Sequence, residues 1–221
     1  METRDRILDV AERLFAEQGL GQTSLRAITA AAGVNLASVH YHFGSKEALV
    51  HAIFERRLKP MNEERLRRLD RLRETRGEDI PLEALIEAFI GPPLELSRDH
   101  EHGGEYFIRL LGRTYTEPTE TLQEHVRSLY ESVSEQFRAA FRTILPDLPR
   151  EDLYWRLHFM VGTLAYCMSG PGTMRLIASS HIDDAQDTAT LVRRLAQFLQ
   201  GGLRAAPLSG DDTDDRAGAA A

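Results

Sequence analysis

His40 and His42, separated by one residue, form the first pair whose side chains could do chemistry. They lie in GVNLASVHYHFGSKEAL, residues 33–49, together with Tyr41 and Lys46. A metal site would need both imidazoles to converge on one ion, but positions i and i+2 of a helix point about 200° apart at roughly 3.6 residues per turn. Contacts to a nucleic acid, or two solvated histidines without a role, are the readings that remain.

The charge distribution favours nucleic acid. The formal net charge of −7 by itself argues against such a partner. However, residues 60–221 carry 19 basic and 27 acidic side chains, a net of −8, whereas residues 1–59 have a net charge of +1. Between Gln18 and Lys46 there is no Asp or Glu at all. A segment without carboxylates is what a surface facing phosphates requires.

Other reactive residues do not assemble into a catalytic set. The charged stretch DHEHGGE, residues 99–105, has metal-ligand residue types, but such loops are usually solvated, and we expect no metal and no cofactor. The chain shows no Ser-His-Asp or Cys-His signature, no phosphate-binding glycine loop and no HExxH. Cys167 is the single cysteine, which excludes an internal disulfide and fits a reducing cytoplasm. We therefore expect a cytoplasmic protein that is not an enzyme.

The elements that position these residues are helices, because apolar residues recur at i, i+3, i+4 and i+7 almost throughout. The N-terminal part contains helices at residues 3–18, 23–32 and 36–43 and the start of a fourth at Lys46, with Thr23, Asn35 and Ser45 as N-caps and a break at Gly33. The expected fold is all-α, with about nine helices and no strands.

Prolines divide the remainder of the chain. Pro60 is expected to bend or break the fourth helix, and GPP at 91–93 to kink or end a helix that starts after Pro81. Further helices are expected at about 105–115, 119–145, 151–169 and 184–204. The predicted divisions are an N-terminal domain at 1–50, a larger helical domain at 51–205, and a disordered acidic tail at 206–221. The longest apolar run, residues 159–174, is too short and too interrupted by glycine and proline to span a membrane.

Three short helices with a tight turn between the second and third are the layout of a helix-turn-helix DNA reader. The third helix would enter the major groove, where Leu36 or Ala37 could contact thymine methyls and Ser38 or His40 could bond base edges. Phosphate contacts are expected from Tyr41, His42 and Lys46. The predicted contact set is completed by Thr23, Ser24, Arg26 and Asn35.

One run of the sequence is specific to a family. The stretch ILDVAERLFAEQGLGQTSLRAITAAAGVNLASVHYHFGSKEAL resembles the DNA-binding segment of the TetR family of bacterial regulators, over about forty-five residues without a gap. Matching elements include Leu14-Phe15-Ala16, Thr23-Ser24, Ala32-Gly33-Val34 and Ser45-Lys46-Glu47. His40 stands where a tyrosine is commonest, which bears on the bases that are read. The resemblance implies a helix-turn-helix fold and binding to double-stranded operator DNA.

A reader of a palindromic operator must be a dimer. The helix at about 151–169 is apolar on two faces, one including Leu153 and Met160 and the other Trp155, Phe159 and Tyr166. One face can pack on its own subunit and the other on a second copy, together with the last helix. The resemblance also implies a homodimer built from the last two long helices. A monomer with the same helices as its core is the alternative.

The resemblance further implies a cavity in the C-terminal domain for a small apolar or amphipathic effector. The expected lining, grouped as apolar walls and polar residues beside them, is Phe89, Ile90, Tyr106, Phe107, Leu110 and Phe159 with Arg109, Arg113 and His158. An arginine beside an apolar pocket can anchor a carboxylate or phosphate. Internal ion pairs to Glu105 or Glu117 are the alternative for the arginines, and a core position is the alternative for His158.

Two C-terminal stretches, IRLLGRTYTEPTETLQEHV and LYWRLHFMVGTLAYCMSG, resemble the PsrA-type, fatty-acid-responsive branch of TetR-like repressors. This second resemblance implies a repressor released by a long-chain fatty acid or acyl-CoA. A repressor of efflux genes that senses drugs or aromatic compounds is the alternative within the same class. A helical enzyme and a lipid-binding or adaptor protein are the alternatives from other classes. The segment without Asp or Glu at residues 18–46 argues against the lipid-binding or adaptor protein.

Overall fold

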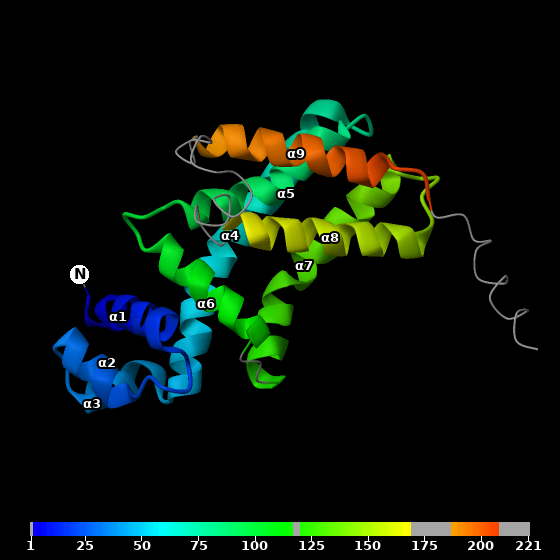
Figure 1. Ribbon diagram of the computed structural model, residues 1–221. Coiled ribbons are helices and arrows are strands. Elements are labelled where there is room, and N and C mark those ends of the chain that lie inside the picture. Colours follow the sequence, from blue (N-terminus) through cyan, green and yellow to red (C-terminus); the bar gives the residue numbers. More distant parts are fainter. Residues whose placement is uncertain (1, 117–119, 169–186, 208–221) are drawn as a thin grey trace, which may run out of the picture.

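The computed structural model describes residues 2–116, 120–168 and 187–207, without the side chains of residues 113–116. All regular structure in these ranges is helical, as predicted. In chain order the helices are α1 (Thr3–Gln18), α2 (Leu25–Ala32), α3 (Leu36–Phe43), α4 (Lys46–Arg76), α5 (Leu82–Ser97), α6 (Gly104–Thr116), α7 (Glu120–Ile144), α8 (Arg150–Met168) and α9 (Thr188–Arg204) (Figure 1). Residues 208–221 of the predicted tail lie outside the described residues.

The N-terminal unit packs α1, α2 and α3 against the first turns of α4 (Figure 1). The α2–α3 turn is closed from both sides: Gly33 adopts a left-handed conformation at φ 63°, and the Asn35 carboxamide oxygen accepts a 2.8 Å bond from the Ser38 amide. Ser45 caps α4 through the Ala48 amide at 3.0 Å. The predicted caps Asn35 and Ser45 and the predicted stop at Gly33 are confirmed.

A buried carboxylate joins this unit to the rest of the protein. Glu12 of α1 is only 2% exposed and binds two arginines of α4, Arg56 at 2.6 Å and Arg57 at 2.9 Å. Arg57 also donates a 2.6 Å hydrogen bond to the carbonyl of His102, just before α6. One carboxylate therefore fixes α1 to α4, and through Arg57 to the α5–α6 loop. Arginine suits this role because its rigid fork can serve two acceptors at once.

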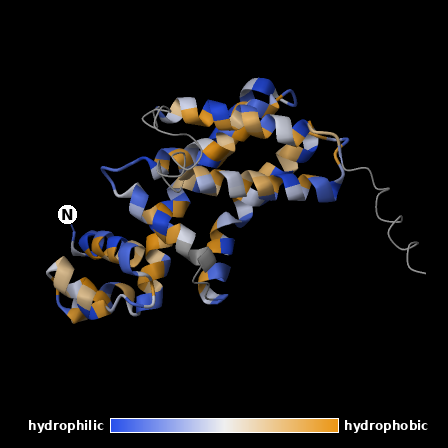
Figure 2. Ribbon diagram, in the orientation of Figure 1, coloured by the Kyte–Doolittle hydropathy of each residue, from blue (hydrophilic) through white to orange (hydrophobic). Residues whose placement is uncertain are grey.

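The hydrophobic core extends across the predicted domain boundary. Its first cluster contains residues of α1–α4 together with Phe107, Ile108 and Leu110 of α6, and the rings of Phe54 and Phe107 meet edge to face at 5.6 Å. A second cluster joins α5, the middle of α4, α7, α8 and α9. Blue and orange residues alternate around most helices in Figure 2, the pattern of helices that bury one side. The division at residue 50 stays a prediction, and α4 crosses it without a break.

Pro60 does not break the fourth helix, so of the two outcomes expected there, a bend or a break, the break is excluded. α4 runs for 31 residues with Pro60 inside it. Pro60 itself is exposed, whereas Leu58, Met61 and Asn62 on either side are buried. Packing on both sides of the proline holds the helical path, which outweighs the single backbone hydrogen bond that a proline removes.

Pro92 and Pro93 likewise lie within α5, which continues to Ser97, so GPP does not end that helix. Pro93 has no N–H to give to the carbonyl of Phe89 four residues earlier. The Arg65 Nε of α4 donates to that carbonyl at 2.8 Å instead. A side chain from the neighbouring helix thus replaces a bond that the backbone cannot make.

Among the described residues, no helix has both the length and the apolar character that crossing a bilayer requires. The apolar run at 159–174 is helical only to Met168 within these ranges, and its remainder lies outside them.

Replacing Glu12 by glutamine should destabilise the protein by about 3 kcal/mol, because it leaves two partly buried guanidinium groups without their carboxylate. Urea unfolding followed by circular dichroism measures this change. Asp9→Asn is the matched control, since Asp9 pairs with the same Arg56 at 2.7 Å but is half exposed, and it should change stability by less than about 1 kcal/mol. Equal effects of the two substitutions would contradict the assignment.

Candidate DNA interface

The third helix presents a face without carboxylates. Val39 is fully buried and fixes α3 against α1 and α2, whereas Tyr41 is 85% exposed and Leu36 38% exposed. Ala37 and His40 are exposed on the same short helix. The small side chain of Ala37 beside the exposed Tyr41 allows α3 to approach a grooved partner such as the DNA major groove closely.

The orientation of His40 is set within its own turn. Its Nδ1 lies 2.9 Å from the carbonyl of Gly44, at the end of α3. A carbonyl can only accept, so Nδ1 carries the proton and the neutral ring offers Nε2 as an acceptor. An exposed acceptor fits the amino groups of cytosine or adenine at base edges. This geometry also separates His40 from His42, whose ring meets that of Tyr41 edge to face at 5.1 Å.

Basic side chains lie beside this face. Arg26 is exposed on α2, and Lys46 opens α4 with its Nζ 5.9 Å from the centre of the Phe15 ring. Lys46 also stands in the first turn of α4, and helix starts of this kind attract phosphate. The structure therefore brings ten of the eleven predicted DNA contacts to α3 and the adjoining starts of α2 and α4: Ser24, Arg26, Asn35, Leu36, Ala37, Ser38, His40, Tyr41, His42 and Lys46.

Thr23 is the exception, and the predicted contact through its side chain is wrong. Thr23 is fully buried, and its hydroxyl donates to the carbonyls of Gly19 at 2.9 Å and Leu14 at 3.3 Å. The N-cap of α2 is Ser24, which accepts from the Ala27 amide at 3.1 Å. Sequence could not separate two adjacent hydroxyl residues, because both are good N-caps and only tertiary packing decides which one turns inward.

The predicted effector residues are not brought together. Ile90, with Phe89 packed beside it, belongs to the second hydrophobic cluster, whereas Phe107 and Leu110, with Tyr106 beside them, belong to the first. Arg109, His158 and Phe159 are exposed on this chain. The side chain of Arg113 lies outside the described residues. The set therefore stays a prediction whose members occupy separate parts of the C-terminal region.

Side chains in the charged loop before α6 are paired with one another. The Nδ1 of His102 lies 2.8 Å from Asp99, and the Nδ1 of His100 lies 3.3 Å from Glu105. The Asp99 carboxylate has a lowered pKa, chiefly because of its hydrogen bond to His102. Within the described ranges, no three His, Cys, Asp or Glu side chains are grouped so that they could hold a metal ion.

Helix α8 carries an exposed aromatic face, as its two-faced pattern predicted. Leu153, Met160 and Leu164 are buried in the second cluster. On the other side, Trp155 is 55% exposed and Phe159 61% exposed, and α9 adds Phe198 at 68%. Contiguous exposed aromatics of this kind mark a surface for another protein chain.

The fold and this surface define a helix-turn-helix DNA-binding protein with a larger helical C-terminal region. The pattern described as bacterial regulatory proteins, tetR family, matches residues 7–53, and the tetracyclin repressor-like C-terminal domain matches residues 87–202. Since the second match covers more than half of the chain, the protein belongs to the TetR family. This is a family of transcriptional regulators rather than of enzymes.

Curated relatives match only in the DNA-binding part. The HTH-type transcriptional regulator AcrR of Shigella flexneri is 50% identical over 54 residues, which are 24% of this chain and 25% of the relative. The repressor KstR2 of Rhodococcus jostii is 48% identical over 50 residues, 23% of this chain and 24% of the relative. The matches thus span about a quarter of these relatives' length.

Solved structures match along about nine-tenths of the chain. FadR of Bacillus halodurans, described as a fatty acid degradation regulator, superimposes with a TM-score of 0.64 at 19% identity, covering 93% of this chain and 98% of the other. A TetR-family regulator of Bordetella parapertussis gives a TM-score of 0.64 at 16% identity, with 89% and 93% covered. At these identities the likeness shows the fold alone.

The hydrogen bonds of the buried Thr23 hydroxyl can be tested by substitution. Thr23→Val keeps the shape but removes the hydroxyl that two buried carbonyls share, so it should lower the free energy of unfolding by about 1–2 kcal/mol. Thr23→Ser retains the hydroxyl and is the matched control. Chemical denaturation of both variants measures the difference. If Thr23 instead touched DNA, Thr23→Val would weaken DNA binding while leaving stability unchanged.

Proposed function

We propose that this protein is a homodimeric, ligand-responsive transcriptional regulator that binds a palindromic operator through α3. The observation that carries the proposal is the surface of α3 and its neighbours: the exposed side chains of the acid-free segment 18–46 include Arg26, His40 and Tyr41, with Lys46 at the start of α4 beside them. An acidic chain has no physical reason to exclude carboxylates from one surface unless that surface meets an anion.

The dimer is part of the same proposal. A single reading head covers only one half-site, and two half-sites in successive major grooves lie about 34 Å apart. The exposed aromatics of α8 and α9 are continuous with the second hydrophobic cluster on the inner side of these helices. A second copy would bury these aromatics in a two-fold interface. Phe159, predicted to line the effector cavity, is better placed for this role.

For the effector we propose a long-chain acyl compound, whose release of the DNA makes the protein a repressor. Support comes from the resemblance of the C-terminal stretches to fatty-acid-responsive regulators and from the extensive apolar interior around α5 and α7. The B. halodurans structure is a fatty acid regulator by its description, although its likeness is one of fold. A cytoplasmic location, where operator DNA lies, belongs to this proposal. The ligand must bind the DNA-competent and DNA-incompetent conformations unequally.

The DNA-binding part of the proposal is tested by Tyr41→Ala and Lys46→Ala. Both should weaken binding at least tenfold without loss of fold, because Tyr41 is largely exposed and Lys46 lies at the surface of the head. Lys46→Ala should also reduce the salt dependence by about one phosphate contact. Fluorescence anisotropy on labelled DNA from upstream of the protein's own gene, across a salt series, measures both effects.

Lys59→Ala is the matched control for these variants, because Lys59 is an exposed lysine on α4 that pairs with Glu55. Its DNA affinity should equal that of the unmodified protein. Unchanged affinity at low salt in both Tyr41→Ala and Lys46→Ala would show that α3 is not the DNA-reading surface.

The interface is tested by Phe159→Glu and Phe198→Glu. Each places a charge at the centre of the exposed aromatic face, and should convert a dimer to a monomer without unfolding the subunit. Sedimentation velocity measures the mass, and DNA affinity should fall together with it. Thr75→Glu adds the same charge at an exposed site near the end of α4 and should leave the dimer intact. Dimers that survive both substitutions would place the interface elsewhere.

A further inference from the structure

Arg65 is a buried cation in the middle of α4. It is 3% exposed and lies between α5 and α7. Its Nε donates to the Phe89 carbonyl at 2.8 Å, one Nη donates to the Asn62 carboxamide at 3.2 Å, and a further hydrogen bond goes to Tyr130. The guanidinium carbon sits 4.1 Å from the centre of the Phe89 ring and 5.9 Å from that of Tyr130.

All of these acceptors are neutral. Within the ranges that the structure describes, no carboxylate comes within ion-pair distance of Arg65. The contrast with neighbouring arginines is direct: Arg68, three residues later, binds Glu64 at 2.6 Å and Glu95 at 2.7 Å, and Arg56 binds Glu12. These less buried arginines of α4 therefore have carboxylate partners, from α4 itself and from α1 and α5, whereas the most buried one has none among the described residues.

A buried charge without a counter-ion is unfavourable, because a low-dielectric interior does not replace the hydration that the charge loses. Burial lowers the pKa of Arg65 to about 10, so the guanidinium is still charged at neutral pH. The contacts with Phe89 and Tyr130 offset part of this cost.

The hydrogen bond from Arg65 to the Phe89 carbonyl does not require a charged donor. The Phe89 carbonyl lacks a helical donor because of Pro93, and one N–H satisfies it. A neutral amide could give the same bond. The aromatic contacts stabilise the charge but do not neutralise it, whereas an anion bound at this place would.

We propose that Arg65 anchors the anionic head of the effector, and that this head is a free carboxylate at the end of an apolar chain. This inference rests on the proposed function as a ligand-responsive regulator. The planar fork of a guanidinium binds a carboxylate through two parallel hydrogen bonds. A CoA thioester presents a neutral carbonyl in that position and has no charge with which to match Arg65.

The surroundings fit the chain of such a ligand. Phe89 and Phe137 meet edge to face at 5.1 Å beside Arg65, and the second hydrophobic cluster continues from them along α5 and α7. A hydrophilic anion such as inorganic phosphate would find only one cation there and an apolar wall on the remaining sides. A carboxylate that carries its own hydrocarbon chain matches both features.

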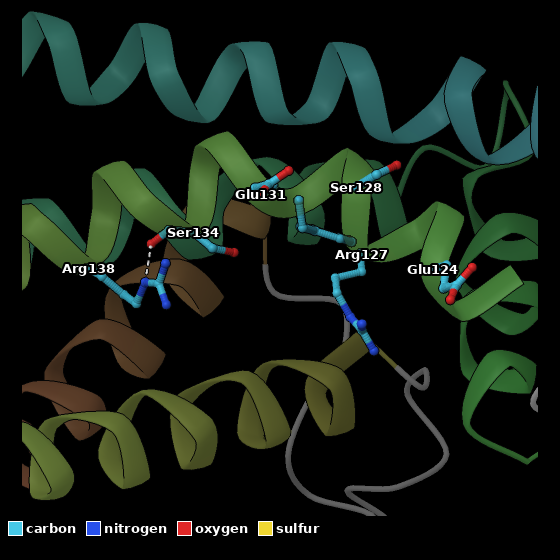
Figure 3. A pocket seen from close by; sticks show the side chains of 7 residues that line it. Glu124, Arg127, Ser128, Glu131, Ser134 and Arg138 are labelled. Atoms are coloured by element: carbon cyan, nitrogen blue, oxygen red, sulfur yellow. Dashed lines mark hydrogen bonds between the residues drawn. The ribbon is translucent and has the colours of Figure 1, made fainter. Parts of the chain in front are cut away.

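Access to Arg65 involves Tyr130. This residue also lines a cavity of about 410 Å³ along α7, together with the arginines Arg127 and Arg138 and the carboxylates Glu124 and Glu131 (Figure 3). Two arginines and two carboxylates on its wall leave the cavity without a net charge from these four side chains. Tyr130 lies on this wall and next to Arg65, so the proposal requires the Tyr130 side chain to move when a carboxylate reaches the guanidinium. Binding would then exchange the Tyr130 and Asn62 contacts of Arg65 for a carboxylate, which changes how α4 is held against α7.

The test compares oleate with methyl oleate, oleyl alcohol and oleoyl-CoA, each below its micellar concentration, on the full-length protein by titration calorimetry. Oleate should bind the unmodified protein at least tenfold more tightly than the methyl ester and the alcohol, and more tightly than oleoyl-CoA. Equal affinity for the acid and its neutral analogues, or a preference for the thioester, would overturn the carboxylate assignment without any variant.

Arg65→Gln keeps a donor for Phe89 and removes the charge. It should lower oleate affinity at least tenfold and abolish the preference over methyl oleate, while Arg65→Lys should retain part of that preference. Arg67→Gln is the matched control, since Arg67 is 66% exposed on the same helix, and should bind oleate normally. A folded Arg65→Gln variant with unchanged oleate affinity would overturn the role of Arg65. If Arg65→Gln does not fold, the affinities of the unmodified protein for oleate and for methyl oleate still test whether the site requires a carboxylate.

Anisotropy on operator DNA separates this inference from the proposed function. Unmodified protein that binds DNA but no carboxylate amphiphile would refute the inference and leave the regulator intact. Protein that binds oleate through Arg65 but no DNA would refute the proposed function instead. Binding of both, with DNA released by oleate in the unmodified protein and not in Arg65→Gln, is the expected result.

Discussion

The carboxylate of Glu12 is the constraint on which the arrangement of this protein depends. A buried carboxylate needs cationic partners, and Glu12 takes both of them from consecutive positions of α4, Arg56 and Arg57. Because Arg57 also holds the His102 carbonyl, the N-terminal helices cannot rotate on α4 without disturbing the start of α6. The edge-to-face contact of Phe54 with Phe107 reinforces the same junction with apolar area. The DNA-binding unit is therefore built into the larger region rather than tethered to it.

Helix α4 connects the candidate DNA surface with the C-terminal core. Lys46 at its first residue lies beside the candidate DNA surface, and Arg65, about 28 Å along the helix at 1.5 Å per residue, lies in the C-terminal core. The proposed effector would act through this helix, because a change in how α4 packs near Arg65 is passed along its continuous hydrogen-bonded turns to the N-terminal end. The Glu12 contacts carry that movement to α1. Coupling of this kind needs only two arrangements of one helix, each favoured by one ligand.

The prolines show how this packing overrides local rules. Pro92 and Pro93 should end a helix, yet α5 continues because Arg65 satisfies the Phe89 carbonyl that Pro93 leaves without a donor. Pro60 should interrupt α4, yet buried residues on both sides keep its course. Arg65 thereby has two roles at one position. It satisfies a backbone carbonyl of α5, and it holds a charge in an apolar interior, which is the basis for the proposal that it anchors the effector.

The sequence by itself determined the helices, their caps at Asn35 and Ser45, and the surface of α3, because these follow from local periodicity and from residues that act within one turn. It also contained a signal for Arg65, which shares the stripe of Leu58, Asn62 and Leu69 on α4, although that signal does not say what surrounds the charge. Only tertiary structure decided that Thr23 turns inward while Ser24 caps, that Glu12 meets two arginines more than forty residues away, and that the predicted effector residues separate. These outcomes depend on contacts between distant segments, whose free energies exceed the local preferences that a sequence pattern records.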